Sequence, residues 1–151
     1  MKNLISSIIF LFFTILPIQA CSDTNHQAIY ILNKNGSSIA IELSPIHPFL
    51  AEYDRILILS LQGGKITKQK LFPDTGGYSS SNLYKCGPTI YLVKGYFDEW
   101  IVDLEAGTII EGQCKEADLE YVGVFKGGGS NPWQFYLPSE YKETKLEAKG
   151  G

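Results

Sequence analysis

The chain contains very few of the side chains from which catalytic centres and metal sites are usually built. Its 151 residues include only two histidines, His26 and His47, and three cysteines. Zinc sites need clustered cysteine and histidine ligands, calcium loops need several alternating acids, and phosphate loops need a lysine after the glycines. No segment of the chain has any of these patterns, so the sequence predicts neither a metal site nor a cofactor.

Positive charge is scarce as well. Thirteen lysines and arginines stand against sixteen acidic residues, which gives a formal net charge of −3. A surface that binds phosphate backbones carries an excess of basic residues, so we expect no nucleic-acid partner. With 44% hydrophobic and 13% aromatic residues, the chain has enough apolar material for a folded core. Its length allows a single domain.

Only one long apolar run occurs, and it lies at the start of the chain. Leu4 to Leu16 is nearly uninterrupted, follows the positive charge of Lys2, and is followed by Pro17-Ile18-Gln19-Ala20. This is the three-part layout of a secretory signal peptide. The run is too short to span a bilayer, which takes about 20 apolar residues. We therefore expect residues 1–20 to be a signal peptide and the mature domain to lie outside the cytoplasm.

The end of this segment, Ile18-Gln19-Ala20-Cys21, resembles the lipobox of bacterial lipoproteins. The resemblance implies that Cys21 becomes the lipid-modified first residue of a periplasmic protein, followed by a spacer over residues 21–26. Ser22 in place of an aspartate implies sorting to the outer membrane. Gln19 departs from the small or hydroxylated residue of the family pattern, so ordinary cleavage at the same bond stays an alternative.

The cysteine count fits this interpretation. Three cysteines in an exported protein leave one thiol to be explained, and lipidation of Cys21 would leave Cys86 and Cys114 as a pair. An oxidising compartment favours a disulfide between them. The bond would close a loop of about 29 residues and stabilise the fold by roughly 3 to 4 kcal/mol. A reduced, buried pair or a disulfide to Cys21 are the alternatives.

The remainder of the chain has the pattern of short β-strands. Asn35-Gly36 is the preferred pair for a tight hairpin turn. The run 55–61 is apolar on successive residues, which indicates a central strand, and the lysine-rich run 66–72 is typical of an exposed edge. Residues 73–81 have no burial pattern and are expected to form a mobile loop. The expected strands are 27–33, 38–43, 55–61, 66–72, 89–94, 99–104, 108–111, 119–125 and 133–137.

This spacing of strands and turns predicts the fold class. About nine short strands with turn signals every 8 to 12 residues indicate an all-β domain over residues 27–137, either an antiparallel sandwich or a small barrel or meander. Residues 138–151 form a weakly ordered tail, with at most one helical turn around residues 141–148.

Two groups of residues could support catalysis. A serine nucleophile needs a nearby base and a group that orients the base, and His47 is the only histidine placed to serve Ser79 with Asp74. No G-x-S-x-G motif accompanies them. Paired carboxylates could instead support glycoside hydrolysis, and three acids lie close in sequence: Asp98, Glu99 and Asp103. Turn and edge acids are more often merely solvated.

Aromatic residues in or beside glycine-rich turns offer a third possibility, because tyrosine and tryptophan anchor protein interfaces. These residues are Tyr78, Tyr84, Tyr96, Phe97, Trp100, Trp133 and Tyr136. The candidate partner-binding residues among them are Tyr78, Tyr84, Tyr96 and Trp133. The alternative is that most of them fill the core, and Trp100 is the member best suited to it.

In size and build the chain resembles small, tethered immunity and lysozyme-inhibitor lipoproteins. Thr75-Gly76-Gly77-Tyr78 is similar to the Ser-Gly-x-x-Tyr loop of the inhibitors. The resemblance implies a non-enzymatic envelope protein, anchored to the membrane by lipid, whose partner is a toxin or a wall-degrading enzyme. A small envelope hydrolase and a structural assembly lipoprotein are the alternatives.

Overall fold

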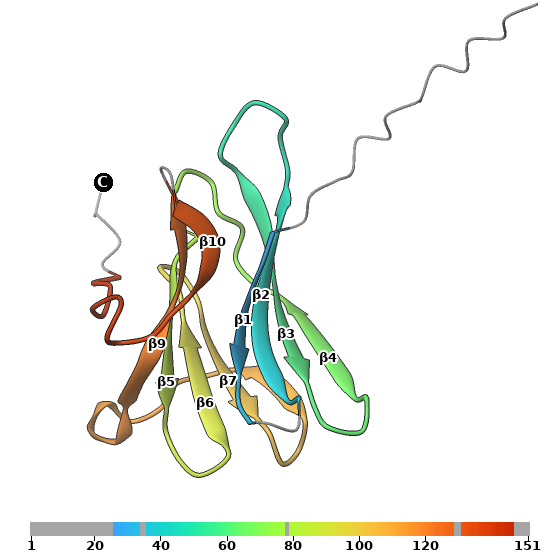
Figure 1. Ribbon diagram of the computed structural model, residues 1–151, viewed down its shortest axis with the longest axis vertical. Coiled ribbons are helices and arrows are strands. Elements are labelled where there is room, and N and C mark those ends of the chain that lie inside the picture. Colours follow the sequence, from blue (N-terminus) through green and yellow to red (C-terminus); the bar gives the residue numbers. More distant parts are fainter. Residues whose placement is uncertain (1–25, 34–35, 78, 129–130, 147–151) are drawn as a thin grey trace, which may run out of the picture.

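Two antiparallel sheets face each other in a computed structural model that describes residues 26–33, 36–77, 79–128 and 131–146 (Figure 1). The signal peptide, the lipobox with Cys21, and Tyr78 lie outside these residues. The strands of the described part are β1 (His26–Ile31), β2 (Ser38–Pro45), β3 (Tyr53–Ser60), β4 (Ile66–Lys70), β5 (Ser81–Lys85), β6 (Ile90–Lys94), β7 (Glu99–Asp103), β8 (Thr108–Glu111), β9 (Glu120–Gly128) and β10 (Asn131–Tyr136). The predicted all-β sandwich is confirmed.

The first sheet has the order β1-β2-β3-β4. β1 and β2 form the predicted hairpin, with His26 opposite Leu43 and Ile31 opposite Ser38. Gly36 in the connecting turn has a φ of 88°, a backbone conformation that residues other than glycine rarely adopt. β3 lies between β2 and β4, and β4 is an edge strand, as the apolar and lysine-rich runs predicted.

The second sheet has the order β10-β9-β5-β6-β7-β8. Its central strand β5 was not predicted, because its sequence begins with two polar residues. Ser81 and Asn82 are nevertheless buried, together with Leu83 and Tyr84 that follow them. Their polar groups are tolerated there because each has a hydrogen-bond partner inside the protein. A short 3-10 helix, η1 (Glu116–Asp118), lies between β8 and β9.

Both sides of the sandwich are joined across the two sheets. On one side β1 packs against β10, and the indole Nε1 of Trp133 donates to the carbonyl of Ile41 at 2.9 Å. On the other side β4 approaches β8, where Thr67 Oγ1 donates to the carbonyl of Gly107 at 2.9 Å. The core between the sheets consists of Ala28, Ile39, Ile41, Leu43, Leu57, Leu59, Leu71, Leu83, Tyr91, Val93, Val102, Ile109 and Phe125. Trp100 packs against this core, as expected.

The described part of the tail does not form the helical turn that the sequence allowed around residues 141–148. Residues 138–140 make a turn, and residues 142–146 have no regular secondary structure. Asn82 binds this segment through two hydrogen bonds with Thr144, at 2.8 and 3.4 Å. The hydroxyl of Tyr84 donates to Glu143 at 2.5 Å. The tail therefore docks on β5, in the middle of the second sheet.

Cys86 and Cys114 form the predicted disulfide pair. Cys86 follows β5 and Cys114 precedes η1, and their Cα atoms are 6.3 Å apart, within the usual range for a disulfide. The bond therefore ties the segment between β8 and β9 to the end of the central strand.

Replacing both cysteines by alanine should lower the free energy of unfolding by roughly 3 to 4 kcal/mol, because the unfolded chain regains the entropy of the open loop. Urea unfolding of the oxidised protein and of the Cys86→Ala/Cys114→Ala variant measures the difference. A reducing agent should destabilise the wild type and leave the variant unchanged. Equal stability of the two oxidised proteins would contradict this account.

Candidate functional site

A buried arginine connects the two sheets below the turn between β6 and β7. Arg55 on β3 is 1% exposed, and its guanidinium lies 3.5 Å from a carboxylate oxygen of Asp98, the last residue of that turn. The same guanidinium donates to Ser81 Oγ at 2.5 Å and to the carbonyl of Phe72 at 3.0 Å. One side chain thus holds a strand, a linker and a turn in fixed relative positions.

The carboxylate of Asp98 completes this arrangement. Its second oxygen accepts a hydrogen bond from the backbone N–H of Phe72 at 2.7 Å. Both backbone groups of Phe72 are therefore held, the carbonyl by Arg55 and the N–H by Asp98. Burial lowers the pKa of Arg55, and the negative charges of Asp98 and Asp74 oppose that shift. The arginine stays charged because its ordinary pKa lies far above neutral.

A glycine makes this close approach possible. The turn is closed by a hydrogen bond from the Gly95 N–H to the Asp98 carbonyl at 2.8 Å. A Cβ atom at Gly95 would overlap the carboxylate of Asp98 and would lie 3.2 Å from the Arg55 guanidinium. Any larger residue at this position would push Asp98 away from Arg55.

Aromatic rings gather on the outside of this turn. The ring centroids of Phe72 and Phe97 are 5.3 Å apart, and those of Phe97 and Tyr96 are 6.4 Å apart. Phe72 is 49% exposed and Phe97 is 48% exposed. We call Phe72, Tyr96 and Phe97 the aromatic cluster. Its rings are held by the buried ion pair below, since Arg55 and Asp98 fix the backbone on which they sit.

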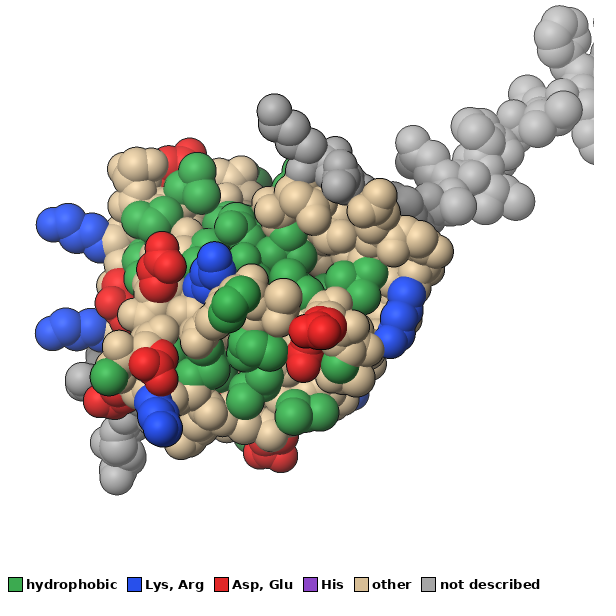
Figure 2. Space-filling model, turned by 90° about the horizontal axis from the view of Figure 1, so that it is seen from below, with side chains coloured by type: hydrophobic (Ala, Val, Ile, Leu, Met, Phe, Trp, Pro, Cys, Tyr) green, Lys and Arg blue, Asp and Glu red, His purple; other side chains and the backbone are tan. Residues whose placement is uncertain are grey.

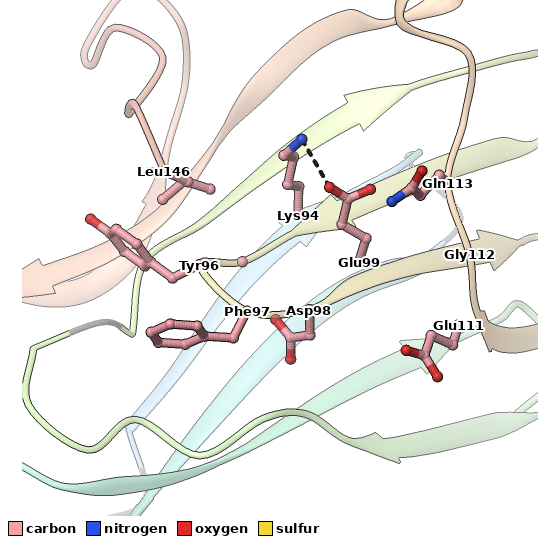
Figure 3. Close-up of a pocket in the computed structure, with 10 residues that line it drawn as sticks. Lys94, Tyr96, Phe97, Asp98, Glu99, Glu111, Gly112, Gln113 and Leu146 are labelled. Carbon is pink, nitrogen blue, oxygen red and sulfur yellow. Dashed lines mark ion pairs between the residues drawn. The ribbon is translucent and has the colours of Figure 1, made fainter. Parts of the chain in front are cut away.

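An open cleft of about 680 Å³ lies beside the aromatic cluster. Its lining consists of Lys94, Gly95, Tyr96, Phe97, Asp98, Glu99, Glu111, Gly112, Gln113 and Leu146. Figure 3 shows Tyr96 and Leu146 at one end of the cleft and Glu111 and Gln113 at the other. Between them an ion pair joins Lys94 Nζ to Glu99 at 2.8 Å. Of the three acids that line the cleft, Asp98 is paired with Arg55 and Glu99 with Lys94, so the net negative charge of the lining comes from Glu111.

The serine, histidine and acid considered for catalysis are not arranged as a triad. Ser79 Oγ donates directly to the carboxylate of Asp74, so no imidazole lies between them. His47 sits in the loop after β2, where its Nδ1 accepts the N–H of Phe49 at 3.4 Å. Ser79 and Asp74 thus form a local contact that shapes the linker after β4.

The three clustered acids each have a structural contact. Asp98 pairs with Arg55, and Glu99 pairs with Lys94. Asp103 accepts hydrogen bonds from the backbone N–H groups of Glu105 and Ala106, at 2.9 and 3.0 Å, in the turn after β7. Strand β7 places Glu99 and Asp103 at its two ends, so they do not face a common reaction centre.

The structure separates the candidate partner-binding residues. Tyr96 lines the cleft, whereas Tyr84 is 6% exposed beneath the tail and Trp133 is half-buried against the core. Tyr84 and Trp133 therefore have structural roles that the sequence did not reveal. Phe72 was missed as a member of the site, because it lies 24 residues before Tyr96 and only the fold brings the two segments together.

Two tyrosines below the tail have raised pKa values. Burial is the main cause for Tyr84, and its hydrogen bond to Glu143 raises the pKa further. Burial together with the charge of Glu143 raises the pKa of Tyr121 to about 12. The rings of these tyrosines lie 5.8 Å apart. Both tyrosines therefore favour the neutral form while the tail is docked.

Within residues 26–146, masked positions aside, no three histidine, cysteine or acidic side chains come together in a way that could hold a metal ion. No helix in the same part of the chain is long and apolar enough to cross a membrane. Comparison of the chain with protein-family models, with curated proteins and with solved structures finds no match.

Replacing Asp98 by alanine should lower the free energy of unfolding by about 3 kcal/mol or more, because it leaves the buried charge of Arg55 without its partner. Glu99→Ala is the matched control. It removes a neighbouring but more exposed ion pair and should lower the free energy of unfolding by less than about 1 kcal/mol. Chemical denaturation of both variants measures the difference, and equal losses would show that the Arg55–Asp98 pair has no special role.

Raising the pH should destabilise the protein above about pH 10. Tyrosines of the unfolded chain ionise near that pH, whereas Tyr84 and Tyr121 stay protonated in the folded chain until higher pH. Their contribution to the free energy of unfolding is complete below pH 10. It is lost as the pH rises toward the pKa values that the two tyrosines have in the folded chain. When urea unfolding is measured from pH 8 to 12, the free energy of unfolding should fall less steeply with pH for Tyr84→Phe than for the wild type. Identical slopes would contradict the assignment.

Proposed function

We propose that the chain is a non-enzymatic lipoprotein of the bacterial cell envelope that binds and neutralises another protein. The partner is a toxin or a wall-degrading enzyme, bound at the aromatic cluster and the acidic cleft beside it. The observation that supports this proposal is the exposed Phe72–Phe97 pair, held on a buried ion pair at the rim of an open cleft. Export and a lipid anchor at Cys21 are inferred from the sequence of the first 21 residues.

Aromatic residues of this kind are suited to anchor a complex. Interface hot spots are enriched in aromatic side chains that become fully buried on binding. Phe72 and Phe97 each retain about half of their exposure in the unbound chain, so a partner can still cover considerable apolar area. Because both backbone groups of Phe72 are already fixed, little ordering is needed on binding, and a prearranged surface loses less entropy.

The charge of the cleft favours a basic partner surface. Glu111 is exposed at the end of the cleft that lies away from Tyr96 and Leu146. Arg55 offsets Asp98 from below and Lys94 offsets Glu99 through its ion pair, so the negative charge of the cleft comes from Glu111. Such a surface attracts lysine and arginine side chains and speeds encounter with a positively charged protein, an effect that salt weakens. A cleft that receives a basic side chain next to aromatic rings also offers a cation–π contact from Tyr96.

Tyr96→Ala and Phe97→Ala should each weaken the complex by at least about 1 kcal/mol, because each removes an aromatic anchor. The partner is first captured by cross-linking in intact envelopes, and the purified chain is tested for inhibition of its activity. Titration of the partner with each variant then gives the loss of affinity. Ile31→Ala, a change at a 67% exposed residue at the end of β1, is the matched control and should bind normally.

Full affinity in both aromatic variants would exclude the cleft as the binding surface. A captured partner whose activity is unchanged by the purified chain would contradict the neutralising role and favour a structural assembly lipoprotein. Circular dichroism and unfolding curves of each variant show that any loss of affinity does not come from loss of the fold.

A further inference from the structure

The loop between β2 and β3 carries the most exposed large apolar side chain among the described residues. Figure 1 shows this loop, residues 46–52, projecting beyond the sandwich. A hydrogen bond from the Ile46 N–H to the Glu52 carbonyl, at 3.0 Å, closes its base. Phe49 is 88% exposed, Leu50 is 54% exposed and Ile46 is 49% exposed. Apolar groups concentrated at one tip of a soluble domain indicate a surface that something covers.

The loop differs in charge from the rest of the surface. The one acid of the loop, Glu52, lies at its base, and residues 45–51, Pro-Ile-His-Pro-Phe-Leu-Ala, contain no lysine, arginine or acid. At the opposite end of the sandwich, Figure 2 shows apolar side chains interspersed with acidic and basic ones. Pro45 and Pro48 restrict the backbone, so the tip loses little conformational freedom when it is buried. An uncharged apolar tip can enter a hydrocarbon layer without the penalty of transferring a charge.

The position of the N-terminal strand relates this loop to the membrane anchor. The described chain begins at His26, which pairs with Leu43 two residues before the end of β2. The chain therefore emerges from the sandwich at the base of the loop. Five peptide steps separate His26 from Cys21, and they span at most about 18 Å when fully extended. A lipid on Cys21 would hold the bilayer surface within reach of the loop.

We propose that the β2–β3 loop is a second membrane contact, in which Phe49 and Leu50 enter the interfacial layer of the lipid bilayer. This inference rests on the lipid anchor of the proposed function and adds an orientation to it. The acyl chains keep the domain at the surface, so the loop inserts from a high local concentration. The end of the sandwich with the loop faces the lipid, and the opposite end points away from it. The β6–β7 turn with the aromatic cluster lies at the same end as the loop, so a partner bound there is engaged close to the membrane.

Tryptophan fluorescence of the acylated protein in vesicles of phosphatidylethanolamine and phosphatidylglycerol tests this inference. The Phe49→Trp variant adds a tryptophan to the native Trp100 and Trp133. The emission of this added tryptophan should shift to the blue on vesicle binding, and its intensity should fall at least twofold when the lipids are brominated. Ile66→Trp is the matched control, because Ile66 is 61% exposed and begins β4 at the far end of β3. That end lies roughly 23 Å from the loop base along the strand, so no lipid quenching is expected there.

Three results would overturn the inference, and they distinguish failure of the loop contact from failure of the lipid anchor. If mass spectrometry shows acylation and the protein floats with vesicles, but the added emission of Phe49→Trp is not quenched, the loop contact is wrong and the anchor stands. If the protein has no acyl chain and does not float, both fail. If that emission escapes lipid quenching but becomes protected from iodide when the captured partner is added, the loop binds protein instead.

Discussion

The ion pair between Arg55 and Asp98 is the contact on which the candidate site depends. A guanidinium that is 1% exposed must have partners, because a buried charge without them is costly. These partners come from three separate segments, namely Ser81, the backbone of Phe72, and Asp98. A buried ion pair often adds little net stability compared with apolar residues of the same volume. Its consequence here is positional, since it fixes the two segments that carry Phe72 and Phe97.

The topology of the sandwich places the functional features at one end. The chain emerges from β1 there, the β2–β3 loop projects from it, and the β6–β7 turn with its aromatic rings lies beside Phe72. The pairing of Tyr53 with Asp74 joins the linker after β4 to the base of the loop. Elsewhere the structure serves stability, through the Trp133 hydrogen bond on one side of the sandwich, the contacts of β4 with β8 on the other, and the disulfide.

The sequence predicted most of the fold, since eight of the ten strands in the described residues follow β-branched, aromatic and apolar runs separated by turn residues, and β4 follows a lysine-rich edge pattern. It did not predict β5, because the burial of Ser81 and Asn82 depends on hydrogen bonds to residues far along the chain. For the same reason Tyr84, expected at a partner surface, proved to be covered by the tail. Of the site, Tyr96 was predicted from its place in a glycine-rich turn. Phe72 was not, because its contact with Phe97, 25 residues further along the chain, is a property of the fold.

Hydrogen–deuterium exchange of the native protein, with and without its captured partner, tests the central claim most directly. If the turn held by Arg55 presents the binding surface, peptides that cover residues 71–73 and 94–99 gain protection in the complex. The turn at residues 61–65, at the opposite end of the sandwich, keeps its exchange rate. Protection confined to other segments, with these peptides unchanged, would contradict the account and place the binding surface elsewhere on the molecule.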